Sequence, residues 1–281
     1  MPPAALRSVV LAILLTTACS RSDPEPVPPP APSEPWPARP PATAQRSQQV
    51  RFSITRPSSG SFELKTRKAR HAGSLRVVRG DLDIDLLNLE ATRGQVEIDL
   101  TGLRMQDDEG ADDRQASSRA QNWLELGASR PPAARERFRW ARFVIESVTD
   151  LSAEAAHEGR REKPKAPGPD AGAGGASAAP SGEIRTVDLT VKGKLRLHGY
   201  EVVQVAALRA AFHYAAPATA GAVPTRVVLT TRRTIPVSLT AHDIRPRDAL
   251  GTVIASEMQL IGTEVAREAR VSVLLEATPR D

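Results

Sequence analysis

Apolar and polar residues alternate most regularly between residues 187 and 197. Val, Leu and Gly occupy the odd positions, and Asp, Thr, Lys and Arg occupy the even positions. Because successive side chains of a β-strand point to opposite faces, the pattern predicts a long strand with one apolar and one charged face. His198 and Gly199 interrupt the alternation, and a second apolar run begins at Val202. The two runs together predict an antiparallel hairpin.

Runs with the same period of two recur along most of the chain. Little helical pattern lies between them, which argues against βαβ units and favours an antiparallel sheet. About eight to ten such strands fit an all-β barrel. A turn is expected at Pro57–Gly60, between the first two runs. The predicted strands are 49–55, 62–67, 81–86, 95–100, 138–151, 183–198, 201–214, 225–231, 234–241 and 268–277.

One stretch, 117–126, has helical spacing instead. It begins with two serines of the kind that cap helices, and Ala120, Trp123 and Leu124 then fall on one helical face. We expect a single short helix that closes one end of the sheet and ends before Pro131 and Pro132.

The amino-terminal residues have the features of an export signal. A basic start is followed by an apolar run at 9–15, which is too short to span a bilayer as a helix. Cys19 follows small residues and resembles the acylated Cys of a bacterial lipobox, although Thr16 stands where that box usually has Leu. We expect residues 1–19 to be a lipoprotein signal peptide with a lipidated Cys19 that anchors the chain on the periplasmic side. Ser20 favours the outer over the inner membrane; the alternative is an ordinary signal peptide.

Two segments are too poor in large apolar residues to fold by themselves. Residues 20–47 are rich in Pro and predict an extended tether. Residues 152–182 are rich in Ala, Gly and Pro and predict a low-complexity insertion in a hairpin loop. The folded domain is therefore expected at 48–281, interrupted by that insertion.

Charge and chemistry exclude several classes of function. The net charge is +5, but the 38 Lys and Arg residues are scattered among acidic ones, so nucleic acid is not an expected partner. A single Cys excludes an intramolecular disulfide. The five His residues are isolated, so neither a metal nor a cofactor is expected. The alternating Asp81, Asp83 and Asp85 predict a solvated strand face, and the acidic segment 107–113 is only a weak calcium candidate.

No catalytic motif is recognisable, so we expect no enzyme. An active site would require His198, His242 and acidic residues to meet at one mouth of the barrel. A closed sheet of about eight strands holds either its own side chains or one small ligand, and periodicity leaves both open. The residues predicted to line the interior are Leu64, Leu82, Ile84, Val96, Ile98, Leu100, Phe143, Ile145, Val191, Leu195, Leu197, Val203, Val205, Leu229 and Val273.

Four segments carry a resemblance to a known family. The segment 193–200 (Gly-Lys-Leu-Arg-Leu-His-Gly-Tyr) resembles the strand and turn Gly-x-Leu-Thr-Leu-His-Gly-Val of the YceI-like, polyisoprenoid-binding family. In the same order as in that family, 73–80 is similar to its Gly-x-Phe-x-x-Phe-x-Gly strand, 119–126 to its Arg-Asp-x-His-Leu helix and 138–143 to its Tyr-Pro-x-Ala-x-Phe strand. The sequence departs from these motifs at Ala120, Asn122 and Arg139, among other positions.

This resemblance implies an extended lipocalin-like barrel that is exported and holds a polyisoprenoid or similar lipid. The expected function is therefore non-catalytic binding of a long-chain isoprenoid or fatty lipid inside a membrane-tethered periplasmic barrel. The alternative is a structural or interaction lipoprotein whose barrel is filled by its own side chains. The sequence leaves the oligomeric state open, and a homodimer is one possibility.

Overall fold

The computed structural model describes residues 47–65, 70–75, 78–107, 109–162, 182–254 and 267–280, all within the compact unit Ala44–Asp281. The predicted signal peptide with Cys19, and the tether up to residue 46, lie outside the described residues. The strands are β1 (Gln49–Lys65), β2 (Arg70–Leu75), β3 (Val78–Asp85), β4 (Arg93–Asp99), β5 (Arg104–Gln106), β6 (Asp112–Asp113), β7 (Trp140–Thr149), β8 (Arg160–Glu162), β9 (Glu183–Leu197), β10 (Tyr200–Tyr214), β11 (Arg226–Thr231), β12 (Ile235–Ser238) and β13 (Glu268–Pro279). The helices are α1 (Arg114–Trp123) and α2 (Pro132–Phe138), with 3-10 turns η1 (Leu89–Ala91), η2 (Leu100–Gly102) and η3 (Ala156–Glu158).

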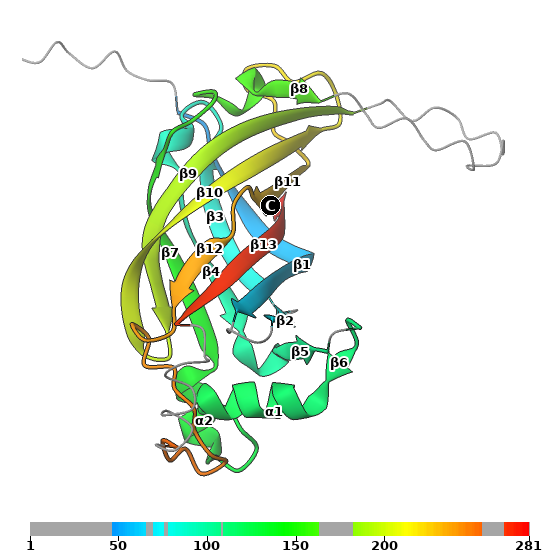
Figure 1. The fold of residues 1–281 in the computed structure, drawn as a ribbon. Helices are drawn as coiled ribbons and strands as arrows, with labels where there is room; N and C mark the ends of the chain where they lie inside the picture. Colours follow the sequence, from blue (N-terminus) through cyan, green and yellow to red (C-terminus); the bar gives the residue numbers. More distant parts are fainter. Residues whose placement is uncertain are drawn as a thin grey trace, which may run out of the picture. The chain divides into compact units, whose positions relative to one another are not determined.

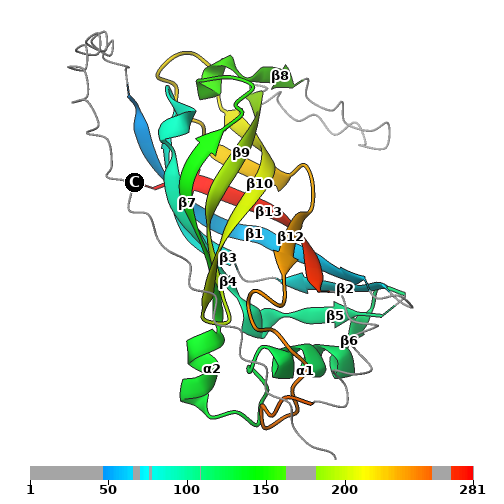
Figure 2. The ribbon, with the colours of Figure 1, turned by 60° about the vertical axis from the view of Figure 1, so that its left-hand side comes forward.

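Eight of the strands form a closed antiparallel ring. Its order is β1-β3-β4-β7-β9-β10-β11-β13, and β13 pairs again with β1. The predicted hairpin of β9 and β10 is its longest ladder, running from Leu197 opposite Tyr200 to Glu183 opposite Tyr214. The two strands curve together along one side of the barrel (Figures 1 and 2). The predicted all-β antiparallel barrel is confirmed.

β1 is one long strand, whereas the sequence predicted two strands separated by a turn at Pro57–Gly60. Its pairing with β13 instead shifts register between Thr55 and Ser59, which makes a β-bulge. The Ser58 hydroxyl donates to the Thr55 carbonyl oxygen at 2.5 Å and accepts from the Glu276 backbone N–H at 2.8 Å. The bulge bends the strand without ending it because Ser58 replaces the missing ladder bonds.

The helical segment also differs from the prediction. The Asp113 side chain caps α1 by accepting from the Ala116 N–H at 2.9 Å, so the helix starts and ends three residues earlier than expected. Pro131 and Pro132 do not merely end a helix; they begin the second helix, α2. Proline suits a first helical turn because its missing N–H would have no helical partner there. No helix among the described residues is long and apolar enough to cross a bilayer.

The predicted insertion at 152–182 is too wide at its start. Ala156 is fully buried in the barrel core, and β8 pairs with β9 through Arg160 opposite Thr186. Small alanines fit closely between neighbouring strands, so an Ala-rich composition here marks packing rather than a solvated loop. Residues 163–181 lie outside the described part of the chain.

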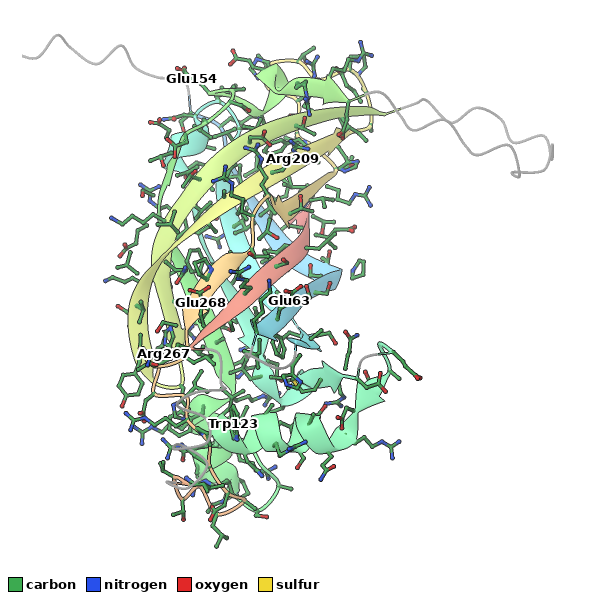
Figure 3. All side chains as sticks on the ribbon, in the orientation of Figure 1. Glu63, Trp123, Glu154, Arg209, Arg267 and Glu268 are labelled. Atoms are coloured by element: carbon green, nitrogen blue, oxygen red, sulfur yellow. The ribbon has the colours of Figure 1, made fainter. Side chains whose placement is uncertain are left out.

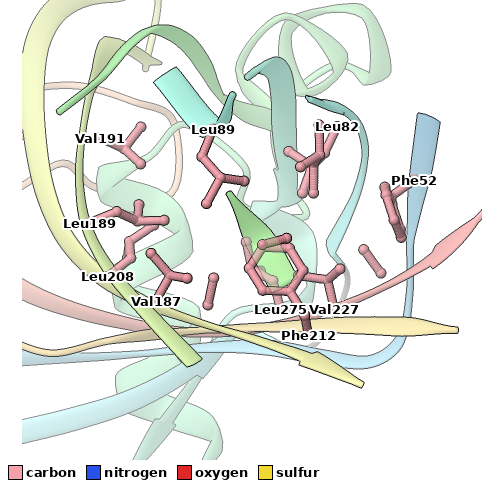
Figure 4. Close-up of a cluster of buried hydrophobic side chains, with 14 of the residues drawn as sticks. Phe52, Leu82, Leu89, Val187, Leu189, Val191, Leu208, Phe212, Val227 and Leu275 are labelled. Atoms are coloured by element: carbon pink, nitrogen blue, oxygen red, sulfur yellow. The ribbon is translucent and has the colours of Figure 1, made fainter. Parts of the chain in front are cut away.

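A hydrophobic core fills one end of the barrel, which we call the closed end, where η1, η3 and β8 lie. Phe52, Val187, Phe212 and Val227 come from four different strands and are buried there (Figure 4). Figure 3 labels Glu154 at this end and Trp123 at the opposite, helical end. A second cluster of buried apolar side chains, which includes Phe62, Leu103 and Leu126, packs at the helical end.

Asp85 also belongs to the closed end, contrary to its predicted place on a solvated face. Its carboxylate accepts from the Ser47 hydroxyl at 2.6 Å and from the Gln48 and Asn88 backbone N–H groups at 3.0 and 3.1 Å. Burial alone would raise the pKa of Asp85, but these hydrogen bonds hold it below its ordinary value. Strand periodicity failed here because β3 ends at Asp85, where the side chain caps the next turn.

Two valines on β9 give a test of this uneven packing. Val187 is 0 % exposed within the closed core, whereas Val191 is 3 % exposed but borders empty space inside the barrel. We expect Val187→Ala to lower the free energy of unfolding by about 2 kcal/mol and Val191→Ala by about half as much, because Val191 loses fewer contacts. Urea unfolding of both variants would measure the difference, and equal losses would contradict it.

Candidate functional site

The barrel interior beyond the closed core contains three adjoining cavities. We call them the inner cavity (about 50 Å³), the middle cavity (about 120 Å³) and the helix-side cavity (about 160 Å³). The inner and middle cavities share the lining residues Leu82, Ile145, Val191, Leu208 and Leu229. The middle and helix-side cavities share Ile98, Ala141, Leu195, Val237 and Val271. The three cavities are therefore successive sections of one interior.

The β9–β10 ladder explains why this interior is apolar. Val191 lies opposite Ala206 and Leu189 opposite Leu208, so odd residues of β9 and even residues of β10 share the inner face. Gly193 is required on the same strand because a Cβ there would come within 2.2 Å of the Val144 carbonyl oxygen and 2.7 Å of the Phe143 ring. Large side chains thus alternate with small ones, which leaves space between them.

All but two of the predicted lining residues border these cavities. Val203 and Val205 were predicted wrongly: both lie on the outer face of β10 and are 52 % and 50 % exposed. The two-residue turn at His198 and Gly199 pairs Leu197 with Tyr200, which puts the even positions of β10 inside. The residues that do border the cavities are Leu64, Leu82, Ile84, Val96, Ile98, Leu100, Phe143, Ile145, Val191, Leu195, Leu197, Leu229 and Val273.

The list of predicted lining residues omitted those of the helix-side cavity that do not belong to the eight-stranded ring. Ala120, Trp123 and Leu124 from α1 and its end line it, together with Leu239 and Ile244 from the loop after β12. The helical spacing of the first three residues indicated an apolar face. No pattern in the sequence indicated that the loop would lie against the same space.

The cavity lining contains almost no polar groups. Thr92 borders the inner cavity and Gln204 the middle one, and the other described lining residues are aliphatic or aromatic. Glu97, the buried acid of β4, is paired on its own side of the wall with Arg79 and Arg142. A charged group inside would find no counter-charge among the described lining residues. The space therefore suits a neutral hydrocarbon chain.

A group of charged residues, which we call the polar clasp, holds the loops at the helical end together. Glu125, after α1, accepts from Arg130 and lies 3.6 Å from Arg247 Nη1. Arg247 also donates to Asp243 at 3.1 Å. His198, at the β9–β10 turn, has its Nδ1 3.1 Å from the His242 carbonyl oxygen. Three segments far apart in the sequence therefore meet beside the helix-side cavity.

The backbone at the clasp is unusual. Glu125, His198 and Asp243 all have left-handed conformations, with φ of 58°, 50° and 51°. Non-glycine residues seldom adopt such angles unless the surrounding contacts impose them. The clasp supplies those contacts, since each of the three side chains is paired within it. Its residues also precede or follow cavity-lining ones: Leu124, Leu197 and Ile244 are direct neighbours of the three.

The clasp brings together the residues that the sequence analysis required for an enzyme. His198 and His242 are buried, and the acidic side chains of Glu125 and Asp243 are held by arginines. Among the described residues no group of three or more His, Cys, Asp or Glu is placed to hold a metal ion. In the acidic segment 107–113, the Asp107 carboxylate accepts a hydrogen bond within a turn and the Asp113 carboxylate caps α1. The arrangement is suited to fastening loops.

The clasp predicts a loss of stability in acid. Burial lowers the pKa of His198, although the His242 carbonyl and the Glu125 carboxylate oppose this shift. Because the unfolded chain then binds the proton first, the contribution of His198 is complete above about pH 6.5 and is lost as the pH falls below it.

We expect His198→Asn, which tolerates the left-handed turn, to reduce the fall in unfolding free energy between about pH 7.5 and pH 5.5. His213 and His242 also have lowered pKa values through burial, so part of the fall should remain. The exposed His71→Asn is the control for this denaturation series. A full pH dependence in His198→Asn would contradict the assignment.

No protein-family model matches this sequence, and no curated protein sequence matches it. Among solved structures, the chain is similar to a polyisoprenoid-binding domain from Saccharophagus degradans implicated in plant cell wall breakdown, with 13 % identity and a TM-score of 0.47 over 83 % of this chain and 100 % of that one. It is also similar to BcnA of Burkholderia cenocepacia, with 15 % identity and a TM-score of 0.45 over 79 % of this chain and 96 % of that one. Because both TM-scores lie below 0.5, the fold class rests on the closed ring of paired strands.

Proposed function

We propose that this protein binds a long-chain isoprenoid or fatty lipid inside its barrel and performs no chemistry on it. The observation that carries the proposal is the series of three adjoining cavities with an apolar lining. Each CH₂ group that moves from water into such a space contributes about 0.8 kcal/mol. A long chain therefore gains affinity along its length without specific polar contacts. The sequence motifs shared with the YceI-like family make a polyisoprenoid the first ligand to test.

The same observation weighs against a barrel filled by its own side chains. Phe52 and Phe212 are among the largest fully buried side chains at the closed end, and the cavities begin directly beside them. An empty apolar space of this kind costs stability, at about 24 cal/mol per Å³ in measured cases. A protein that needed only a scaffold would gain stability by filling it.

The location of the protein is also part of the proposal. We infer export through the signal peptide 1–19, acylation of Cys19 and a position on the periplasmic side of the envelope, with Ser20 favouring the outer membrane. The Pro-rich segment 20–47 would then let the barrel reach away from the lipid anchor. Sequence features alone support this part.

A blocking substitution tests ligand binding. Ala141 lies at the junction of the middle and helix-side cavities, so Ala141→Phe should fill the junction and weaken binding at least about tenfold. Val144→Phe, on the outer face of the same strand, is the control and should bind as the wild type does. Titration with parinaric acid, a polyene fatty acid that fluoresces in apolar surroundings, gives the affinity, and geranylgeraniol serves as the isoprenoid competitor. A wild-type chain that takes up neither compound would refute the proposal.

The anchor has a separate test. Cys19→Ser removes the thiol that would be acylated, so we expect the protein to move from the membrane fraction to the soluble fraction of the envelope. Immunoblots of fractionated cells measure this, with Ser20→Ala as the control. Unchanged membrane association of Cys19→Ser would contradict acylation at this residue.

A further inference from the structure

The barrel wall is incomplete between β10 and β12. The position between β10 and β13 is filled by two short strands, β11 near the closed end and β12 near the helical end (Figure 1). β11 pairs with both neighbours, whereas among the described residues β12 pairs with β13 only. We call the boundary between β12 and the first half of β10 the seam.

Two features prevent the ladder from continuing across the seam. Among the described residues, the last backbone hydrogen bond on this side of β10 runs from the Arg232 N–H to the Ala207 carbonyl oxygen at 2.9 Å, and the chain then bends before β12. Pro236 then lies at the centre of β12, and its carbonyl group faces β10. A strand residue points its N–H and C=O to the same side, but proline has no N–H to donate.

One side chain bridges the seam. Gln204 Nε2 of β10 donates to the Pro236 carbonyl oxygen at 2.8 Å. Gln204 is also the polar residue in the lining of the middle cavity, where Ala206, Ile235 and Val237 lie around it. Gln204 therefore lies between the middle cavity and the seam.

Two exposed valines lie on the outer surface beside the seam. Val203 and Val205 flank Gln204 on β10 and are about half exposed. Charged residues border these valines on β9, where Lys194 lies opposite Val203 and pairs with Glu146 and Glu201. Exposed apolar side chains that lie together beside an opening mark a place where an apolar ligand makes its first contact.

The two ends of the barrel offer poorer routes. At the closed end, Phe52, Val187 and Val227 are fully buried between the cavities and the solvent. At the helical end the loop after β12 lies over the cavity and is fastened by the polar clasp through Arg247. Separating the clasp would break several ion pairs, whereas opening the seam breaks one neutral hydrogen bond.

We propose that the seam is the portal through which a single apolar chain reaches the middle cavity, and that Gln204 is the latch that holds it closed. This inference rests on the proposed function, because the portal requires that the cavity receives a lipid chain. The outer valines receive the chain, the Gln204–Pro236 bond breaks, and the chain slides between β10 and β12. The bond forms again behind it.

The test measures rates rather than affinity alone. In stopped-flow experiments with the full-length chain and parinaric acid, Gln204→Ala should raise both the uptake and the release rate by about three- to tenfold, the factor expected for one hydrogen bond. The dissociation constant should stay nearly constant because the two rates rise together. Gln204→Met keeps the side-chain length without a charge and cannot donate, so it should behave in the same way, and circular dichroism confirms that each variant is folded.

Gln48→Ala is a matched control. Gln48 Nε2 also donates to a backbone carbonyl oxygen, that of Gly221, at 2.9 Å, but this bond lies at the closed end. Its loss should leave both rates unchanged. Unchanged rates in both Gln204 variants would overturn the portal. If the wild-type chain still binds parinaric acid in that case, the proposed function stands. Faster release with unchanged uptake would also overturn it, because Gln204 would then be a ligand contact. No wild-type uptake at all would refute the proposed function itself.

Discussion

The ladder between β1 and β13 is the interaction on which the rest of the structure depends. It joins the first and last strands of the described chain, from Phe52 opposite Pro279 to Leu64 opposite Ala269. Without it the sheet would be an open ribbon with two exposed edges and no interior. The Ser58 hydroxyl preserves this ladder through the bulge, where backbone pairing alone would fail. Closing the ring therefore depends on a side chain as well as on the strands.

Within the closed ring, the distribution of side-chain volume determines where the barrel is solid and where it is hollow. Phe52 and Phe212 lie in the closed core, whereas Ala141, Gly193 and Ala206 face the interior farther along. Strand periodicity places all of these residues inward without distinguishing them. The hollow part lowers stability, and the closed core and the continuous ladder must offset that cost.

The barrel is closed by different means at its end and in its wall. At the helical end, the ion pairs around Glu125 hold three loops in strained backbone conformations. In the wall, one hydrogen bond from the side-chain amide of Gln204 takes the place of a strand ladder that Pro236 prevents. This contrast in strength is the reason that the proposed portal lies in the wall and not at the helical end. Binding would need only local movement while the ring remains intact.

The sequence by itself determined the local properties: most of the strands, their antiparallel character, the inward face of β9 and most of the lining residues. These properties follow from the alternation of inward and outward side chains along a strand, which can be read from neighbouring residues in the sequence. Only the tertiary structure decided the inward face of β10, because the pairing of Leu197 with Tyr200 sets it and Val203 and Val205 look equally apolar in the sequence. It also decided that the barrel is hollow and that Glu125, His198 and Arg247 meet. Such contacts join residues far apart in the chain, where no local spacing connects them.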